Sequence, residues 1–220
     1  MKRSLLTALA LFAASTTAQA QDSNWCRNGL FPSEPPFELA EVTAPGRTFF
    51  YDDAGACPDG EGCRTRSYLI EGDKLLINRT FGPWTCAFYP GKGGGTAGWI
   101  ETRRLRTLVT DKAPPLEAWI GQWAGSEDNP SIRFWQEYGK LHVVGEAFWP
   151  GRPERTDWPS IHIGEISGQV ERKGNTGRYE DDMLCEIDFT LVGQFLVGAS
   201  NRNCGGANVS FTAVYKRESD

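Results

Sequence analysis

The sequence predicts an all-β protein made of two consecutive antiparallel units, the second of them a small barrel. Gly occurs 25 times and Pro 13 times in 220 residues, a composition that suits short strands joined by turns. In the second half, apolar and polar residues alternate with a period of two, for example in 141–145 and 185–191. A strand with one buried face shows this alternation. Four of the six cysteines precede residue 111 and two follow it, so each unit can close its own disulfides.

The first 20 residues are predicted to be a secretory signal peptide. Lys2 and Arg3 precede an apolar run over residues 5–14, and an Ala-x-Ala cleavage site ends at Ala20. The alternative is a membrane anchor, but a spanning helix needs about 20 apolar residues and this run is shorter. No other apolar stretch predicts a membrane span. We therefore expect a periplasmic or secreted protein.

The charge balance is mildly acidic, with 23 Lys and Arg against 28 Asp and Glu and a formal charge of −5. A nucleic-acid-binding surface needs clustered basic residues, so we expect no nucleic-acid partner. Hydrophobic residues make up 40% of the chain, including 8 Trp and 12 Phe. This content is enough for a packed core and argues against a disordered chain.

The even number of cysteines predicts disulfides, because an exported chain meets an oxidising environment. The alternative is a zinc site, in which cysteines are usually roughly two to four residues apart, a spacing that no pair here has. We therefore expect no metal ion. The predicted pairs are Cys57–Cys63, which brackets a short loop, Cys185–Cys204, which ties strands of the second unit, and, by elimination, Cys26–Cys86.

Composition divides the mature chain into an extended N-terminal arm (21–39), a first unit (40–110), a Pro-containing linker (111–118) and a second unit (119–220). Consecutive prolines hold such a linker extended. Where the linker ends, helical spacing is found among Leu116, Trp119, Ile120 and Trp123. Gly121 weakens a helix, so a short helix and the lead-in to a strand both remain open.

Three motifs follow one another in the first unit. A Gly72-Asp73 turn precedes an apolar strand, Trp84 stands three residues before an alanine, and Gly98-Trp99-Ile100 lies near the end. In this order the motifs resemble the bacterial SH3-like modules of exported proteins, and the resemblance covers residues 40–110. It implies an SH3-like barrel.

The SH3-like resemblance also implies a ligand groove walled by Tyr51 and Trp84, since flat rings bury large apolar areas at low entropic cost. We expect Tyr89 nearby. Arg103 and Arg104 replace the Asn-Tyr pair of the family and give the groove a basic rim. A polyproline ligand needs apolar walls, so we do not expect a proline-rich peptide. The expected ligand is a cell-wall peptide or an exported protein.

The second unit carries two further resemblances. Gly121-Gln122-Trp123 is similar to the G-x-W of lipocalin-like barrels, and the ending from Cys204 to Phe211 resembles small exported barrels of lysozyme-inhibitor-like proteins. The resemblance implies a small antiparallel lipocalin-like barrel. It also implies an alternative function, an inhibitor or immunity protein that blocks a lysozyme or another peptidoglycan hydrolase.

Catalytic candidates are few. His142 and His162 are the only histidines, and neither has a partner for proton transfer in a recognisable motif. Paired carboxylates at 52–53 and 180–182 could bind calcium or act as acid and base, but such clusters are more often solvated turns. We therefore expect no catalytic residue and no cofactor. The favoured function is non-catalytic binding in the bacterial envelope, and a cell-wall enzyme is the third alternative.

Overall fold

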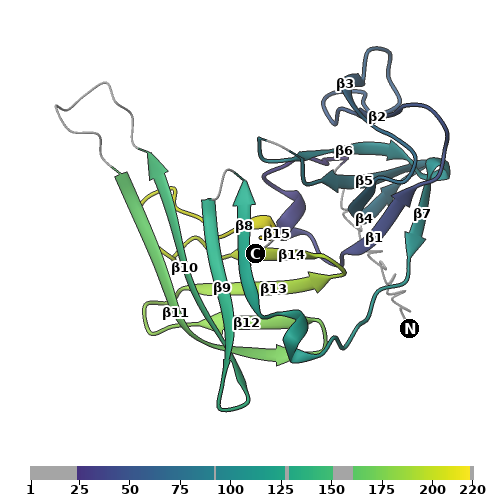
Figure 1. Ribbon diagram of the computed structural model, residues 1–220. Coiled ribbons are helices and arrows are strands. Elements are labelled where there is room, and N and C mark those ends of the chain that lie inside the picture. The colour runs from purple at the N-terminus through teal and green to yellow at the C-terminus, as the bar shows by residue number, and fades with distance from the viewer. Residues whose placement is uncertain (1–23, 92, 127–128, 151–160, 219–220) are drawn as a thin grey trace, which may run out of the picture.

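The computed structural model describes residues 24–91, 93–126, 129–150 and 161–218, and within them it is all-β (Figure 1). One antiparallel sheet forms the first unit and a closed antiparallel barrel forms the second. The predicted signal peptide lies outside the described residues. Among the described residues, no helix is long and apolar enough to cross a membrane.

The first sheet has seven strands in the order β3-β2-β6-β5-β4-β1-β7. Its two faces contact two separate apolar clusters, because neighbouring side chains of a strand point to opposite faces. The strands are β1 (Glu38–Val42), β2 (Thr48–Tyr51), β3 (Arg64–Leu69), β4 (Lys74–Phe81), β5 (Trp84–Tyr89), β6 (Thr96–Glu101) and β7 (Leu105–Leu108).

The barrel is an up-and-down meander of eight strands, in which each strand pairs with the next and β15 pairs with β8. The predicted period-two pattern is confirmed: the apolar members of the alternating runs form one buried cluster inside the barrel. Eight strands leave an interior just wide enough for side chains. The strands are β8 (Gly121–Ser126), β9 (Asn129–Glu137), β10 (Lys140–Pro150), β11 (Ile161–Lys173), β12 (Thr176–Glu180), β13 (Glu186–Val192), β14 (Phe195–Ser200) and β15 (Ala213–Arg217).

The segment before the barrel is the lead-in to a strand, the second of the two alternatives. A single 3-10 turn, η3 (Leu116–Ala118), precedes β8. Gly121 has φ +130, a backbone conformation that disfavours other residues, so the helical spacing cannot extend through it. Trp119 and Trp123 both enter the barrel, and the Trp123 indole N–H donates to the Trp119 carbonyl (2.9 Å).

The N-terminal arm is part of the core rather than a tether. Phe31, in the 3-10 turn η1 (Phe31–Ser33), and Phe37 are buried in a cluster that contains residues of both units. The barrel contributes outward-facing side chains to this cluster, Phe195 and Val214 among them. Val214 stands on the face that alternation predicts to be polar, and it is buried because the arm covers it. The two units therefore share one apolar interface, beside which the purple arm runs (Figure 1).

All three predicted disulfides are confirmed, at Cys26–Cys86, Cys57–Cys63 and Cys185–Cys204. The first joins the arm to β5, the second closes the β2–β3 loop, and the third joins the start of β13 to the loop that follows β14. Three intramolecular disulfides indicate an oxidising environment outside the cytoplasm.

Candidate functional site

The expected groove pair, Tyr51 and Trp84, is in contact, with ring centroids 4.5 Å apart. Trp84 is only 8% exposed, however, and its indole N–H donates to the Asp59 carboxylate (2.7 Å). Asp59 belongs to the loop that the Cys57–Cys63 disulfide closes. This loop occupies the place where a ligand would meet Trp84, so the aromatic pair is an internal contact.

Tyr89 is not beside this pair, and that expectation was wrong. Tyr89 packs against the apolar cluster on the opposite face of the sheet from Trp84. The two residues are five positions apart in one strand, and an odd separation places side chains on opposite faces.

The two arginines of the expected basic rim have different surroundings. Arg103 is exposed and forms an ion pair with Glu101 (2.8 Å). Arg104 instead donates from Nε to the Thr48 hydroxyl (2.9 Å) and from its guanidinium to two carbonyl oxygens of the β1–β2 turn (3.1 and 3.2 Å). Its hydrogen bonds stabilise that turn, and only Arg103 remains turned to solvent.

The two histidines lie far apart on the β10–β11 hairpin. His142 stacks on Trp135, with ring centroids 5.4 Å apart, and His162 lies against Gly206. His142 pairs with Gln169, which is seven residues from His162, or about 23 Å at roughly 3.3 Å per residue. All six cysteines are in disulfides. Among the described residues, no group of His, Cys, Asp and Glu comes together that could hold a metal ion.

One carboxylate of each expected cluster is structural, Asp53 in the first and Asp181 in the second, while Asp52, Glu180 and Asp182 are exposed as expected of solvated turns. Asp53 is 5% exposed and accepts from the Cys26 backbone N–H (2.8 Å) and from two nitrogens of Arg27 (2.7 and 2.8 Å). Burial raises the pKa of Asp53, but these hydrogen bonds outweigh burial and lower it. The Asp53–Arg27 ion pair therefore fixes the N-terminal arm to the segment that follows β2.

The exposed apolar surface is concentrated at one end of the barrel, where β10 ends, β11 begins and the β12–β13 loop turns. Met183 is 80% exposed and Leu184 is 71% exposed. One surface hollow is lined by both Met183 and Ile163. Trp149 is also exposed, but it points to the opposite face of the hairpin from Phe148 and lines a different hollow. The large exposed apolar side chains on the outer face of this end are Phe148, Ile161, Ile163, Met183 and Leu184. We call this set the barrel-end patch.

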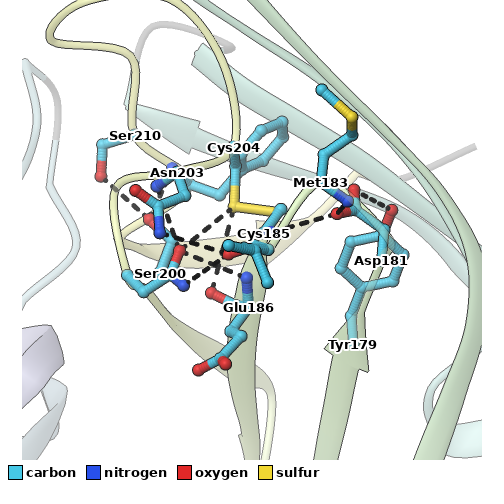
Figure 2. The surroundings of a disulfide bond; sticks show 12 residues. Tyr179, Asp181, Met183, Cys185, Glu186, Ser200, Asn203, Cys204 and Ser210 are labelled. Carbon is cyan, nitrogen blue, oxygen red and sulfur yellow. Dashed lines mark hydrogen bonds between the residues drawn. A yellow bond between two sulfur atoms is a disulfide. The ribbon is translucent and has the colours of Figure 1, made fainter.

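The β12–β13 loop that presents Met183 and Leu184 is held from below by Asp181 (Figure 2). One carboxylate oxygen of Asp181 accepts from the backbone N–H groups of Met183 (2.8 Å) and Cys185 (3.0 Å), and the other accepts from the Tyr179 hydroxyl (3.2 Å). Burial, and then the Asp181 carboxylate, raise the pKa of Tyr179, so its hydroxyl stays a donor. The loop is pre-organised by these bonds.

Leu184 itself has φ +64, a conformation that costs a non-glycine residue roughly 1–2 kcal/mol. Its carbonyl accepts from the side-chain amides of Asn201 (2.8 Å) and Asn203 (3.3 Å). The Cys185–Cys204 disulfide joins the two loops at this point. These hydrogen bonds and the disulfide therefore keep a bulky apolar residue exposed to solvent in a strained backbone conformation.

Sequence reasoning missed this loop because two apolar residues in a turn have no periodicity. The one available signal was the position of Met183 and Leu184 between an acidic pair and a cysteine. Comparisons with protein families, with curated proteins and with solved structures found no match for this chain.

Proposed function

We propose that this chain is a non-catalytic exported binding protein of the bacterial envelope, and that it recognises another exported protein through the barrel-end patch. The observation that carries the proposal is Leu184, exposed and strained on a loop that Asp181, two asparagines and a disulfide hold in place. Strained residues that the surrounding structure over-determines are concentrated at binding and catalytic sites.

The energetics favour a protein partner over a small ligand. Burying one Leu or Met side chain contributes about 1.5–3 kcal/mol, and the patch contains five large apolar residues. Clusters of such residues form the centres of protein interfaces. The interior of the barrel offers no comparable site, because Trp119, Phe134, Phe189 and Tyr215 are packed inside it.

A second candidate is inhibition of a cell-wall hydrolase, which would place this protein among inhibitors or immunity proteins. A rigid apolar loop that enters the cleft of an enzyme is the usual design of a protein inhibitor, since pre-organisation reduces the entropic cost of binding. Met183 and Leu184 form such a loop. An inhibition assay against envelope hydrolases separates this function from binding alone.

The test is capture from an envelope extract, with the wild-type protein and the variant Leu184→Asn as baits. Asn tolerates positive φ better than Leu, so this variant keeps the fold and removes the apolar side chain. Tyr138→Asn is the matched control, because Tyr138 also has positive φ (49) and is 95% exposed, in the β9–β10 turn. We expect Leu184→Asn to lose the captured protein and Tyr138→Asn to retain it. Equal capture by all three baits would contradict the proposed site.

A further inference from the structure

Among the described residues, one edge of β11 has no neighbouring strand beside the barrel-end patch. Pairing with β10 covers Ile161–Val170, but pairing with β12 covers only Val170–Lys173. On its β12 side, the first half of β11 therefore has no ladder partner in the described part of the chain. An open edge offers its N–H and C=O groups to an added strand.

The backbone groups of Glu165 lie on this open edge. The Ile163 carbonyl accepts from Gly206 N–H (3.1 Å), and Ser167 N–H donates to the Tyr179 hydroxyl (3.3 Å), so both residues face away from β10. Backbone groups of alternate residues in a strand point to the same edge, and Glu165 stands between these two. Within the described parts of the chain, its N–H and C=O have no partner there.

A surface hollow runs along this edge. Ile163 and Glu165 line one side, Asp181 and Met183 line the other, and the Cys185–Cys204 disulfide contributes to the lining as well. Figure 2 shows the loop side, with Met183 and Asp181 to the right of the disulfide. An extended segment in this hollow could pair with Glu165 while its side chains contact Ile163 and Met183.

The β10–β11 hairpin carries two acidic side chains next to each other on its exposed face. Glu146 lies directly opposite Glu165 and both side chains are exposed. Like charges in this relation destabilise a sheet, and among the described residues neither carboxylate forms an ion pair. The next pair outward along the same face is Phe148 with Ile163, both exposed. The face thus combines two unneutralised carboxylates with apolar side chains.

We propose that the open edge of β11 binds an extended segment of the partner protein by β-strand addition, and that this segment carries a Lys or Arg with an apolar residue two positions away on each side. Main-chain hydrogen bonds to Glu165 would supply register. The basic side chain would lie beside Glu165 and point towards Glu146, and the apolar side chains on the same face would cover Ile163 and Met183. Strand addition to an open edge with side-chain pockets is an established mode of peptide recognition. This inference rests on the proposed function and names its partner's chemistry.

The probe is a capped peptide, Val-Ser-Lys-Ser-Val, whose Lys and two Val side chains lie on one face of an extended strand. It is titrated into the labelled full-length protein at low ionic strength and followed by the backbone amide resonances. We expect the largest shifts at Ile163, Glu165 and Met183. Two control peptides, one with Glu in place of Lys and one N-methylated at alternate amides, should bind at least tenfold more weakly. The first removes charge complementarity and the second removes strand pairing.

Protein variants complete the test. Glu146→Gln with Glu165→Gln should weaken binding of the Lys peptide several-fold, whereas Glu137→Gln, an exposed Glu at the opposite end of β9, should not. Equal binding of all three peptides, or shifts confined to other strands, would overturn the inference. Self-association of the double variant with unchanged peptide binding would also overturn it, because the glutamates would then serve only to protect the edge.

Failure of this inference is distinguishable from failure of the proposed function. If the peptides do not bind at β11 but Leu184→Asn still loses the captured protein, the barrel-end patch is the site and strand addition is wrong. If the peptides bind at β11 but Leu184→Asn captures as well as wild type, strand addition stands and the loop is not needed for it.

Discussion

The indole N–H of Trp84 donates a 2.7 Å hydrogen bond to the carboxylate of Asp59. This bond joins the strand that would supply the wall of an SH3-like groove to the disulfide loop that lies over it. Trp84 is therefore a structural residue in this chain, and the site of recognition has to be sought elsewhere. The barrel-end patch is the site that both its exposed position and its apolar content favour for binding.

Asp59→Ala should loosen the loop over Trp84 without destroying the sheet. A hydrogen bond to a charged group contributes about 1.5–3 kcal/mol. Because Asp59 is exposed, we expect a loss of stability somewhat below this range, about 1 kcal/mol. Urea unfolding measures the loss, and hydrogen exchange of the Trp84 indole N–H should become faster. If the indole proton exchanges at the wild-type rate, the Asp59 loop does not shield Trp84 from solvent.

Leu184→Asn should maintain or increase stability while it removes binding. The strained φ of Leu184 is disfavoured by roughly 1–2 kcal/mol, and Asn avoids part of this cost. Thermal unfolding gives the sign. A clear loss of stability would mean that Leu184 supports the fold and is not held there for recognition.

Acid should weaken the attachment of the N-terminal arm through Asp53. The folded-state pKa of Asp53 is lowered, so this carboxylate contributes stability above its unfolded-state pKa of about 3.9. That contribution is lost as the pH falls through the lower folded-state pKa. Unfolding of wild type and Asp53→Asn should differ by about 1–2 kcal/mol at neutral pH and converge in strong acid. A constant difference across this range would contradict the assignment.

Removal of either of two disulfides should lower stability, but removal of only one of them should also weaken binding. Cys26–Cys86 and Cys185–Cys204 close separations of 60 and 19 residues, for which chain entropy predicts losses of about 4 and about 3 kcal/mol on removal. Each pair is replaced by two alanines and compared by urea unfolding. Only the Cys185→Ala, Cys204→Ala variant should also lose the captured protein, because that bridge supports the Leu184 loop. If both variants remain folded and both lose the captured protein, the Cys185–Cys204 bridge has no special role in binding.

Much of the fold could be predicted from the sequence, because it depends on local patterns. The alternation of Leu141, Val143 and Gly145 identified an inward strand face. The cysteine positions indicated two bridges, and elimination gave the third, Cys26–Cys86. Val214 could not be placed, because its burial depends on the arm packing across both units. Contacts between segments distant in sequence leave no periodic signal.

The candidate site was harder to predict for the same reason. Trp84 was assigned to an open groove because the family resemblance cannot show that Asp59 covers it. Tyr89 was misplaced because it was expected near the groove on the grounds that it shares the face of Thr85 and Ala87, and that face lies opposite Trp84. Leu184 left no signal at all, since backbone strain is a property of the folded loop.

The most direct measurement of the central claim is hydrogen exchange of the complex with its captured partner, compared with the free protein. The account predicts new protection of the 181–185 loop and of residues 161–167, with the segment around Trp84 and Arg103 unchanged. Protection over 84–103 with unchanged exchange in 181–185 would contradict it and return the binding site to the first sheet.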